Sequence, residues 1–328
     1  MTNIIDSIKN DFKIHKIRNM QLDPNGFCNA GCWFCPVRYR GNPKDTKSNM
    51  PVDLLEKIFA DIIQERDTNG LVDKAFNGFY TSHYNEILLY KHFEELLKIA
   101  RKYKLIFMVL SNGTPLTPQK TDLLIEYKDV ISGVCLNVPC FEAEVWAKRV
   151  NLSESLFPRL IENIQYFIDN HQMQLSIQVN GWDGKNTWLE KGENFPLDLL
   201  DDENEKQTNL AKQMFPKANV FQMPHLVDRA GSISDVITNK HAINKYHHGK
   251  KVIGCMNSAE HGGRPVGWIH VNALGECFLC CNDIEMEMKF GDFKSQNLRD
   301  FWGKEDHIQT IVDSYEGICT NCASAKYE

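Results

Sequence analysis

Residues 28–35 read Cys-Asn-Ala-Gly-Cys-Trp-Phe-Cys, so that Cys28, Cys32 and Cys35 are spaced as CxxxCxxC. This stretch follows a short apolar run at residues 19–23, which we interpret as the first strand of the fold. Thiolates are soft ligands that select zinc, copper(I) or iron–sulfur clusters. Three cysteines leave one iron of a cubane without a protein ligand, and that open iron can bind a substrate or a cofactor directly. Gly31 tolerates the backbone angles that a loop wrapped closely around a cluster requires.

The other cysteines also favour metal binding over disulfides. The chain has 328 residues and 11 cysteines, most of which fall at residues 28–35 and 255–322. The N-terminus mixes charged residues throughout and lacks the apolar core of a signal peptide, so we expect a cytoplasmic protein whose thiols stay reduced. Clustered cysteines in that setting are more often metal ligands.

The composition argues against two classes of partner. Hydrophobic residues make up 42% and charged residues 24%, as in ordinary globular proteins. The sequence contains no run of about 18 apolar residues, so we expect no membrane span. The net charge is −6 and no long basic block is visible, so we expect no nucleic-acid partner.

Short apolar runs alternate with longer segments of helical periodicity between residues 17 and 230. The runs predict six strands, at residues 19–23, 74–78, 105–111, 131–138, 174–180 and 219–224. Helices are expected between them, at residues 51–63, 91–103, 119–127, 154–170 and 198–214. Alternating strands and helices are typical of parallel βα units, so we predict an α/β fold with a partial, TIM-like (β/α)6 barrel.

The sequence beyond this pattern has a different organisation. Residues 183–196 read as an irregular insertion, and residues 232–254 are polar and aperiodic, like a linker. Residues 268–271 and 277–281 predict a β-hairpin around a turn at 272–275, and residues 297–311 predict a short helix. We therefore expect a core at residues 1–231, a linker at 232–254 and a small C-terminal iron–sulfur domain of β-hairpin and helix at 255–328.

The CxxxCxxC spacing after the first strand of a βα-rich chain resembles that of the radical S-adenosylmethionine (SAM) superfamily. In that superfamily SAM chelates the open iron, and an electron from the cluster cleaves SAM to methionine and a 5′-deoxyadenosyl radical, which abstracts hydrogen from the substrate. The resemblance implies that Cys28, Cys32 and Cys35 hold a [4Fe–4S] cluster. Phe34 would lie in the cofactor site and shield the cluster from water. The alternative is a zinc knuckle or a redox-active triplet.

The segment after the second predicted strand resembles the one with which this superfamily binds the amino group of SAM. That segment is usually Gly-Gly-Glu-Pro-like, whereas residues 84–87 here read Tyr-Asn-Glu-Ile, with Glu86 in the acidic position and Ile87 in place of proline. A carboxylate suits an ammonium partner, so the resemblance implies that Glu86 binds SAM. The alternative is a surface glutamate that happens to follow a strand.

Several polar residues stand where the later strands are expected to end, and the carboxyl ends of strands carry function in barrels of this kind. Residues 111–113, Ser-Asn-Gly, resemble a turn that the superfamily uses there. The alternative for each residue is that its polar side chain makes its hydrogen bonds at the end of its own strand and binds no cofactor. The residues that we assign to the SAM site on this basis are Ser111, Asn112, Asn137, Gln178 and Asn180.

The second cysteine group comprises Cys255, Cys277, Cys280, Cys281, Cys319 and Cys322. Two C-x2-C pairs, at residues 277–280 and 319–322, permit a zinc ribbon. The pattern Gly275-x4-Cys280 before the pair at 319–322 instead resembles the SPASM/twitch extension, which binds auxiliary [4Fe–4S] clusters. Because the chain stops six residues past the last cysteine, we expect one auxiliary cluster.

Four auxiliary ligands must be chosen from these six cysteines. Alternation along a strand puts Cys280 on the face opposite Cys277 and Cys281. The glycine spacing of the resembling extension favours Cys280, and Cys281 is its rival. The expected ligands are Cys255, Cys280, Cys319 and Cys322.

Two further features bear on the substrate. Asp228 and Arg229 follow the sixth predicted strand in an Asp-Arg-Ala-Gly stretch that resembles one in related enzymes, and they could grip the substrate or form an internal ion pair. Cys140 could return a hydrogen atom to a substrate radical, although a buried structural cysteine is more common. Candidates for the rim of the pocket are Tyr80, His83, Tyr84, Trp182 and His225.

The resemblance implies an enzyme that uses SAM and two [4Fe–4S] clusters. We expect an oxidoreductase that acts on a peptide or a small molecule, with the auxiliary cluster accepting an electron and a flavodoxin or ferredoxin as the external one-electron donor. One alternative is a redox-neutral epimerase or mutase, which would need a hydrogen donor such as Cys140. Another is an iron–sulfur or zinc module without catalysis.

Overall fold

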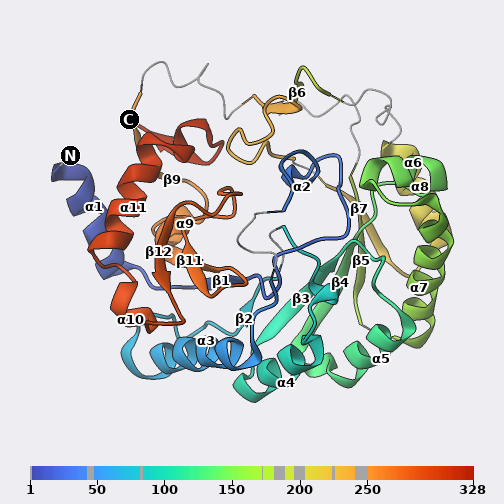
Figure 1. Cartoon of the computed structure of the whole chain (residues 1–328), viewed down its shortest axis with the longest axis horizontal. Helices are drawn as coiled ribbons and strands as arrows, with labels where there is room; N and C mark the ends of the chain where they lie inside the picture. The colour runs from blue at the N-terminus through green and yellow to red at the C-terminus, as the bar shows by residue number, and fades with distance from the viewer. Residues whose placement is uncertain are drawn as a thin grey trace.

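The computed structural model describes residues 2–42, 48–81, 84–171, 173–180, 189–195, 204–223, 226–240 and 250–328. Figure 1 shows a curved sheet whose outer side is covered by a row of helices, with the C-terminal elements beside the N-terminal helix.

The sheet of the core has five parallel strands in the order β2-β3-β4-β5-β7. They are β2 (Gly78–Phe79), β3 (Ile106–Ser111), β4 (Ile131–Asn137), β5 (Leu175–Val179) and β7 (Asn219–Gln222). Strand β1 (Asn19–Leu22) lies beside β2, because Leu22 N donates to Tyr80 O at 2.8 Å and Tyr80 N donates to Met20 O at 2.8 Å. The predicted partial barrel is therefore confirmed, with its strands in chain order.

The outer helices bury one apolar face each against this sheet. In α3 the buried side chains recur at helical spacing from Leu54 to Ile62, and full burial of a Leu, Ile or Phe side chain contributes about 1.5–3 kcal/mol. Helix α5 begins at Pro118, where the missing N–H costs nothing, and the Thr117 hydroxyl accepts from Lys120 N. These helices are α3 (Val52–Gln64), α4 (Phe93–Tyr103), α5 (Pro118–Glu126), α6 (Ala143–Val150), α7 (Phe157–Asn170) and α8 (Asn204–Met214).

The C-terminal part continues the barrel. Strand β10 (Trp268–Val271) pairs in parallel with β1, and β11 (Glu276–Phe278) and β12 (Lys289–Asp292) extend this second sheet antiparallel. Helix α11 (Glu305–Glu316) packs on α1 (Thr2–Ile14), where the Phe12 and His307 rings lie 5.0 Å apart edge to face (Figure 1). The predicted hairpin is thus present, and its first strand joins the core directly.

The remaining elements are short. Two small antiparallel pairs form, one between β6 (Leu189–Lys191) and β8 (Ile237–Asn239) and one between β9 (Val252–Cys255) and β13 (Ala325–Tyr327). The short helices are α2 (Pro36–Arg40), η2 (Glu65–Asn69), η3 (Ile87–Leu89), η4 (Lys128–Val130), η5 (Glu154–Leu156), η7 (Ala259–His261), α9 (Arg264–Gly267), α10 (Leu298–Phe301) and η8 (Ile318–Asn321).

Two boundaries differ from the sequence prediction. The second strand covers residues 78–79 rather than 74–78, because Asp73 accepts from Ala75 N and turns the chain there. The helix predicted at 297–311 is broken into α10 and α11 at Gly303, which has a positive φ of 66°. Much of the insertion predicted at 183–196 and the start of the helix predicted at 198–214 lie outside the described residues.

The segment predicted as a linker is packed over its first part. Ile233, Val236 and Ile237 are fully buried and contact a cluster that includes Trp33. Three apolar residues among polar neighbours do not recur at the spacing of a helix or a strand. The sequence alone therefore does not predict that this segment is packed. The domain boundaries at residues 231 and 255 stay a prediction.

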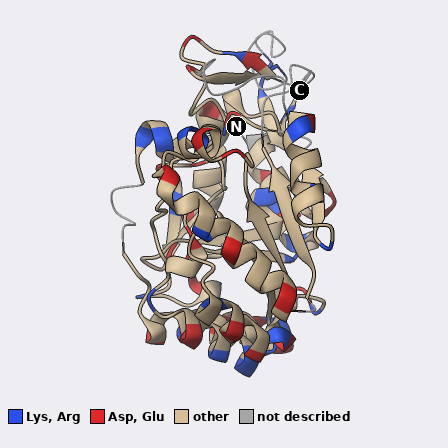
Figure 2. Cartoon of the chain, turned by 90° about the vertical axis from the view of Figure 1, so that its right-hand side faces the viewer, with Lys and Arg blue, Asp and Glu red and all other residues tan. Residues whose placement is uncertain are grey.

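Charged side chains of both signs are interspersed along the helices that face the viewer in Figure 2. Of the helices in the described part of the chain, none has the length and apolar character that crossing a membrane would require.

Candidate functional site

A cavity of about 390 Å³ lies at the carboxyl ends of the strands, beside the first cysteine loop. The loop contributes all three cysteines and Phe34, the segment before η3 contributes Tyr84 and Glu86, and Arg229 closes the opposite side. The lining residues from the strands and the turns after them include Leu110, Ser111, Asn112, Cys135, Asn137, Gln178 and Asn180. The structure therefore brings the cysteine triplet and every SAM-site residue predicted from the sequence to one cavity.

The cysteine loop is held by backbone contacts to the end of α6. Gly31 N donates to Val150 O at 2.8 Å, and Trp33 N donates to Arg149 O at 2.9 Å. Arg38 also donates to Gly31 O at 3.2 Å. Trp33 is fully buried and its indole N–H donates to Asn180 O at 3.2 Å, so this ring seals the base of the loop.

The three thiols of this loop suit a metal cluster. Burial raises the pKa of the Cys28 thiol to about 12 and also raises the pKa of Cys32 and Cys35. Iron bound by the thiolates supplies the positive charge that such a buried group needs, so metal binding and loss of the thiol protons are coupled. The donor set of three soft ligands therefore fits a [4Fe–4S] cluster with one open iron.

Glu86 ties the second and third strands to the cysteine loop. Its carboxylate is 1% exposed and accepts from Asn112 N at 2.8 Å and Leu88 N at 3.1 Å. The Asn112 side chain in turn donates to Asn29 Oδ1 at 2.8 Å, within the loop. Burial raises the pKa of Glu86 to about 7, and an ammonium group in the cavity would stabilise the ionised form.

Replacement of Glu86 by Gln is expected to weaken SAM binding about 10- to 100-fold, because one charge-assisted hydrogen bond is lost. Because the pKa of Glu86 is raised to about 7, the carboxyl is protonated below that pH and ionised above it. SAM affinity of the wild type should then fall about tenfold per pH unit below 7, and the variant should lose this dependence. Equilibrium dialysis with the anaerobic, cluster-loaded protein measures both, and exposed Glu144→Gln is the control. Equal affinities for the wild type and Glu86→Gln would contradict the assignment.

The strand ends offer polar atoms that the protein itself leaves unused. Within the described residues, Asn137 Oδ1 and Asn180 Nδ2 are buried and have no hydrogen-bond partner. Gln178 donates to Asn180 Oδ1 at 3.1 Å. Unpaired buried polar groups are costly, so these atoms fit a ligand with hydroxyl or amino groups, such as the ribose of SAM. Ser111 differs, because its hydroxyl already accepts from Gly113 N at 3.0 Å.

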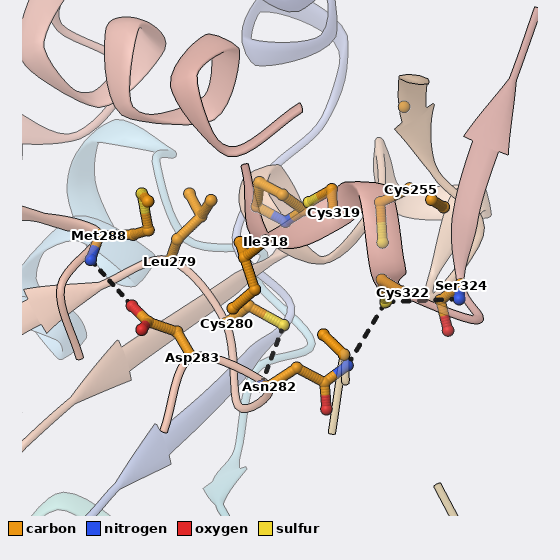
Figure 3. Close-up of a pocket in the computed structure, with 14 residues that line it drawn as sticks. Cys255, Leu279, Cys280, Asn282, Asp283, Met288, Ile318, Cys319, Cys322 and Ser324 are labelled. Carbon is orange, nitrogen blue, oxygen red and sulfur yellow. Dashed lines mark hydrogen bonds between the residues drawn. The ribbon is translucent and has the colours of Figure 1, made fainter. Parts of the chain in front are cut away.

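A second cavity lies among the C-terminal cysteines, as Figure 3 shows. Asn282 N donates to Cys280 Sγ at 3.5 Å, and Asn282 Nδ2 donates to Cys322 Sγ at 3.5 Å. Ser324 N donates to Cys322 Sγ at 3.4 Å. Hydrogen bonds to sulfur set the potentials of iron–sulfur clusters. The four cysteines that line this cavity come from the end of β9, the turn after β11 and η8, and they are Cys255, Cys280, Cys319 and Cys322.

The other two cysteines of this group lie elsewhere. Cys277 is fully buried in the apolar core, so the four cysteines of the alternative, a zinc ribbon, do not share this cavity. Cys281 is hydrogen-bonded to Cys280 but is not among the residues that line the cavity. No three His, Cys, Asp or Glu side chains in the described ranges converge on one metal ion. A cubane differs from such a site because each thiolate binds a different iron.

The turn at residues 228–231 contributes to both cavities. Arg229 lines the first cavity and Ala230 lines the second. Both residues have positive φ, at 52° and 56°, so the turn is held in a conformation that costs energy outside glycine. Asp228 supports the turn, since its carboxylate is 2% exposed and accepts from Asn239 N at 3.1 Å. Asp228 is not among the residues that line the first cavity, and its hydrogen bond to Asn239 favours the alternative in which it fixes the loop, whereas Arg229 lines the cavity.

The structure does not support Cys140 as a hydrogen donor. Cys140 is fully buried, accepts from Glu142 N at 3.4 Å and does not line the cavity. Cys135 lines it instead, and strand alternation could have found this residue, because it lies two positions before Asn137. Among the rim candidates, Tyr84 lines the cavity and Tyr80 stacks on Trp268 with ring centroids 5.3 Å apart. His83, Trp182 and His225 lie outside the described residues.

Comparison with known families identifies the chain. Residues 23–186, half of the sequence, match the model of the radical SAM superfamily. The chain belongs to the radical SAM superfamily. Residues 263–323 match the SPASM model, described as an iron–sulfur cluster-binding domain. The protein is therefore a radical SAM enzyme that uses SAM and a [4Fe–4S] cluster, with a SPASM domain for auxiliary iron–sulfur binding.

Solved structures share this fold at low sequence identity. BtrN in complex with AdoMet and 2-DOIA has 16% identity and a TM-score of 0.53, with 93% of this chain and 92% of that chain covered. Streptococcus suis SuiB bound to the precursor peptide SuiA has 12% identity and a TM-score of 0.60, with 94% and 71% covered. Native anSMEcpe with bound AdoMet has 12% identity and a TM-score of 0.54, with 89% and 82% covered. Comparison with curated proteins found no significant match.

Proposed function

We propose that this protein is a radical SAM oxidoreductase that removes hydrogen from a peptide or small-molecule substrate and passes an electron from the substrate to one auxiliary [4Fe–4S] cluster. The observation that carries the proposal is the adjacency of the two cavities. Consecutive residues reach both cavities, since Arg229 lines the first and Ala230 lines the second. The Tyr84 hydroxyl also donates to Cys281 O at 3.0 Å, linking the first cavity to the cysteine turn of the second.

In this proposal each cavity has a distinct task. With a cluster and SAM bound, the first cavity would supply the 5′-deoxyadenosyl radical chemistry that takes a hydrogen atom from the substrate. Glu86 holds the SAM ammonium group, while Asn137 and Asn180 offer their unpaired polar atoms to the nucleoside. Trp33 and Phe34 exclude water from the cluster loop. Loss of one hydrogen atom to the radical, one electron to the auxiliary cluster and one proton to solvent completes a two-electron oxidation.

The neighbouring structures support both substrate classes. BtrN was solved with the small molecule 2-DOIA, and SuiB with the precursor peptide SuiA. The redox-neutral alternative receives no support from Cys140, which is fully buried away from the cavity. A cytoplasmic location, in which thiols stay reduced, belongs to the same proposal.

The hypothesis that the protein is an enzyme can be tested without knowledge of its substrate. Anaerobically reconstituted protein incubated with dithionite and SAM is expected to form 5′-deoxyadenosine, which liquid chromatography detects. If none forms from protein with a full complement of iron and sulfide, the proposal is contradicted. Once a substrate is identified, a product lacking two hydrogens supports the oxidoreductase, whereas an isomeric product with solvent deuterium supports the redox-neutral alternative.

A further inference from the structure

A groove of about 690 Å³ separates α1 from the start of α11, on the outside of the molecule. Lys9, Lys13 and Lys16 line it with exposed side chains, and His15 and Glu305 complete its charged and titratable lining. Ile8 of α1 is buried, whereas the three lysines are exposed, so packing of the helix does not require the lysines. We refer to this surface, defined by Lys9, Lys13, His15 and Lys16, as the basic groove.

The basic groove lies directly behind the auxiliary cysteine site. A Cβ built on Gly262 would lie 2.8 Å from Cδ2 of His15, so the two residues are in close contact. A Cβ built on the next residue, Gly263, would lie 3.0 Å from Cβ of Cys255. A path of contacts therefore runs from the floor of the groove through two glycines to Cys255.

The charge of the groove is opposite to that of the protein as a whole. The chain has a net charge of −6, whereas three lysines and one glutamate line the groove. A local patch of one sign steers partners of the opposite sign and sets their orientation, with little dependence on the overall charge. An acidic protein repelled by most of the surface would thus be directed to this face.

We propose that the basic groove is the docking site of an acidic one-electron carrier of the flavodoxin class, which exchanges electrons with the auxiliary cluster. The inference rests on the proposed function, because an auxiliary cluster that takes one electron per turnover must return it before the next. In this step the reduced auxiliary cluster loses one electron and the oxidised carrier gains it, and no other reactant is needed. The path through Gly262 and Gly263 places the carrier on the side of Cys255.

The test compares two charge-reversed holoenzymes that carry the same change in net charge. The groove variant is Lys9→Glu/Lys13→Glu/Lys16→Glu, and the matched control is Lys128→Glu/Lys212→Glu/Lys217→Glu, at exposed positions on the other side of the fold. Dithionite-reduced enzyme is freed of reductant and mixed with oxidised flavodoxin in a stopped-flow instrument. We expect the rate of flavodoxin reduction to fall about tenfold or more in the groove variant and much less in the control. The wild-type rate should also fall steeply with salt, and the groove variant should lose that dependence.

Equal rates in the groove variant and the wild type, or equal losses in the two variants, would overturn the docking site. Iron content and 5′-deoxyadenosine formation with dithionite are measured on every protein, since neither needs a carrier. Failure of those two readouts in the wild type would count against the proposed function, whereas their retention beside unchanged flavodoxin rates counts only against the groove.

Discussion

Replacement of Cys28, Cys32 and Cys35 together by alanine is expected to abolish 5′-deoxyadenosine formation while the protein keeps about half of its iron. The three thiols line the first cavity, whereas the auxiliary cysteines line the second. The triple variant therefore leaves every auxiliary cysteine in place. Without these ligands the first cluster as a whole is lost, and SAM has no cluster to bind. The auxiliary site should still hold one [4Fe–4S] cluster, so iron and sulfide fall together by about half.

The measurement is iron, sulfide and zinc analysis of the purified triple variant, together with the SAM cleavage assay. Cys140→Ala is the matched control, because Cys140 is buried away from both cavities and its removal should leave iron and SAM cleavage unchanged. Zinc in place of iron in the triple variant would contradict the auxiliary cluster and favour a zinc site.

The first cavity was largely predictable because its residues follow from chain order. Each predicted SAM-site residue comes just after a strand or near its carboxyl end, and parallel strands bring these ends to one edge of the sheet. Glu86 and Asn112 are 26 positions apart, yet their contact follows from the pairing of β2 with β3. Such sites can be read from a sequence without knowledge of loop conformations.

The features that sequence reasoning left open or missed depend on tertiary packing. The role of Asp228 depends on a hydrogen bond to Asn239, in a segment whose three buried apolar residues have no regular period. Similarly, Cys135 and Cys140 are both near the end of β4, but only the former lies on the strand face that meets the cavity. Periodicity reports which face is buried, and does not tell a core from a cavity.

The choice between Cys280 and Cys281 as auxiliary ligand gives the second large expected effect. Cys280 lines the second cavity with Cys255, Cys319 and Cys322, and accepts a hydrogen bond from Asn282 N. Cys281 follows it in the same turn, and its carbonyl accepts the Tyr84 hydroxyl, on the side of the first cavity. The two adjacent residues thus differ: Cys280 lines the second cavity, whereas Cys281 contacts Tyr84, a residue of the first.

Cys280→Ala is accordingly expected to lose the auxiliary cluster, with iron falling by about half, and to lose substrate oxidation while SAM cleavage with dithionite remains. Because cluster binding is linked to folding, the C-terminal part of this variant should also become less resistant to proteolysis. Cys281→Ala is the matched comparison, since it removes an identical thiol one residue away and should retain iron near the wild-type level. Iron analysis and electron paramagnetic resonance of the reduced proteins distinguish the two. The reverse pattern, with iron lost in Cys281→Ala and kept in Cys280→Ala, would assign the ligand to Cys281 and would require the turn after β11 to rotate when the cluster binds.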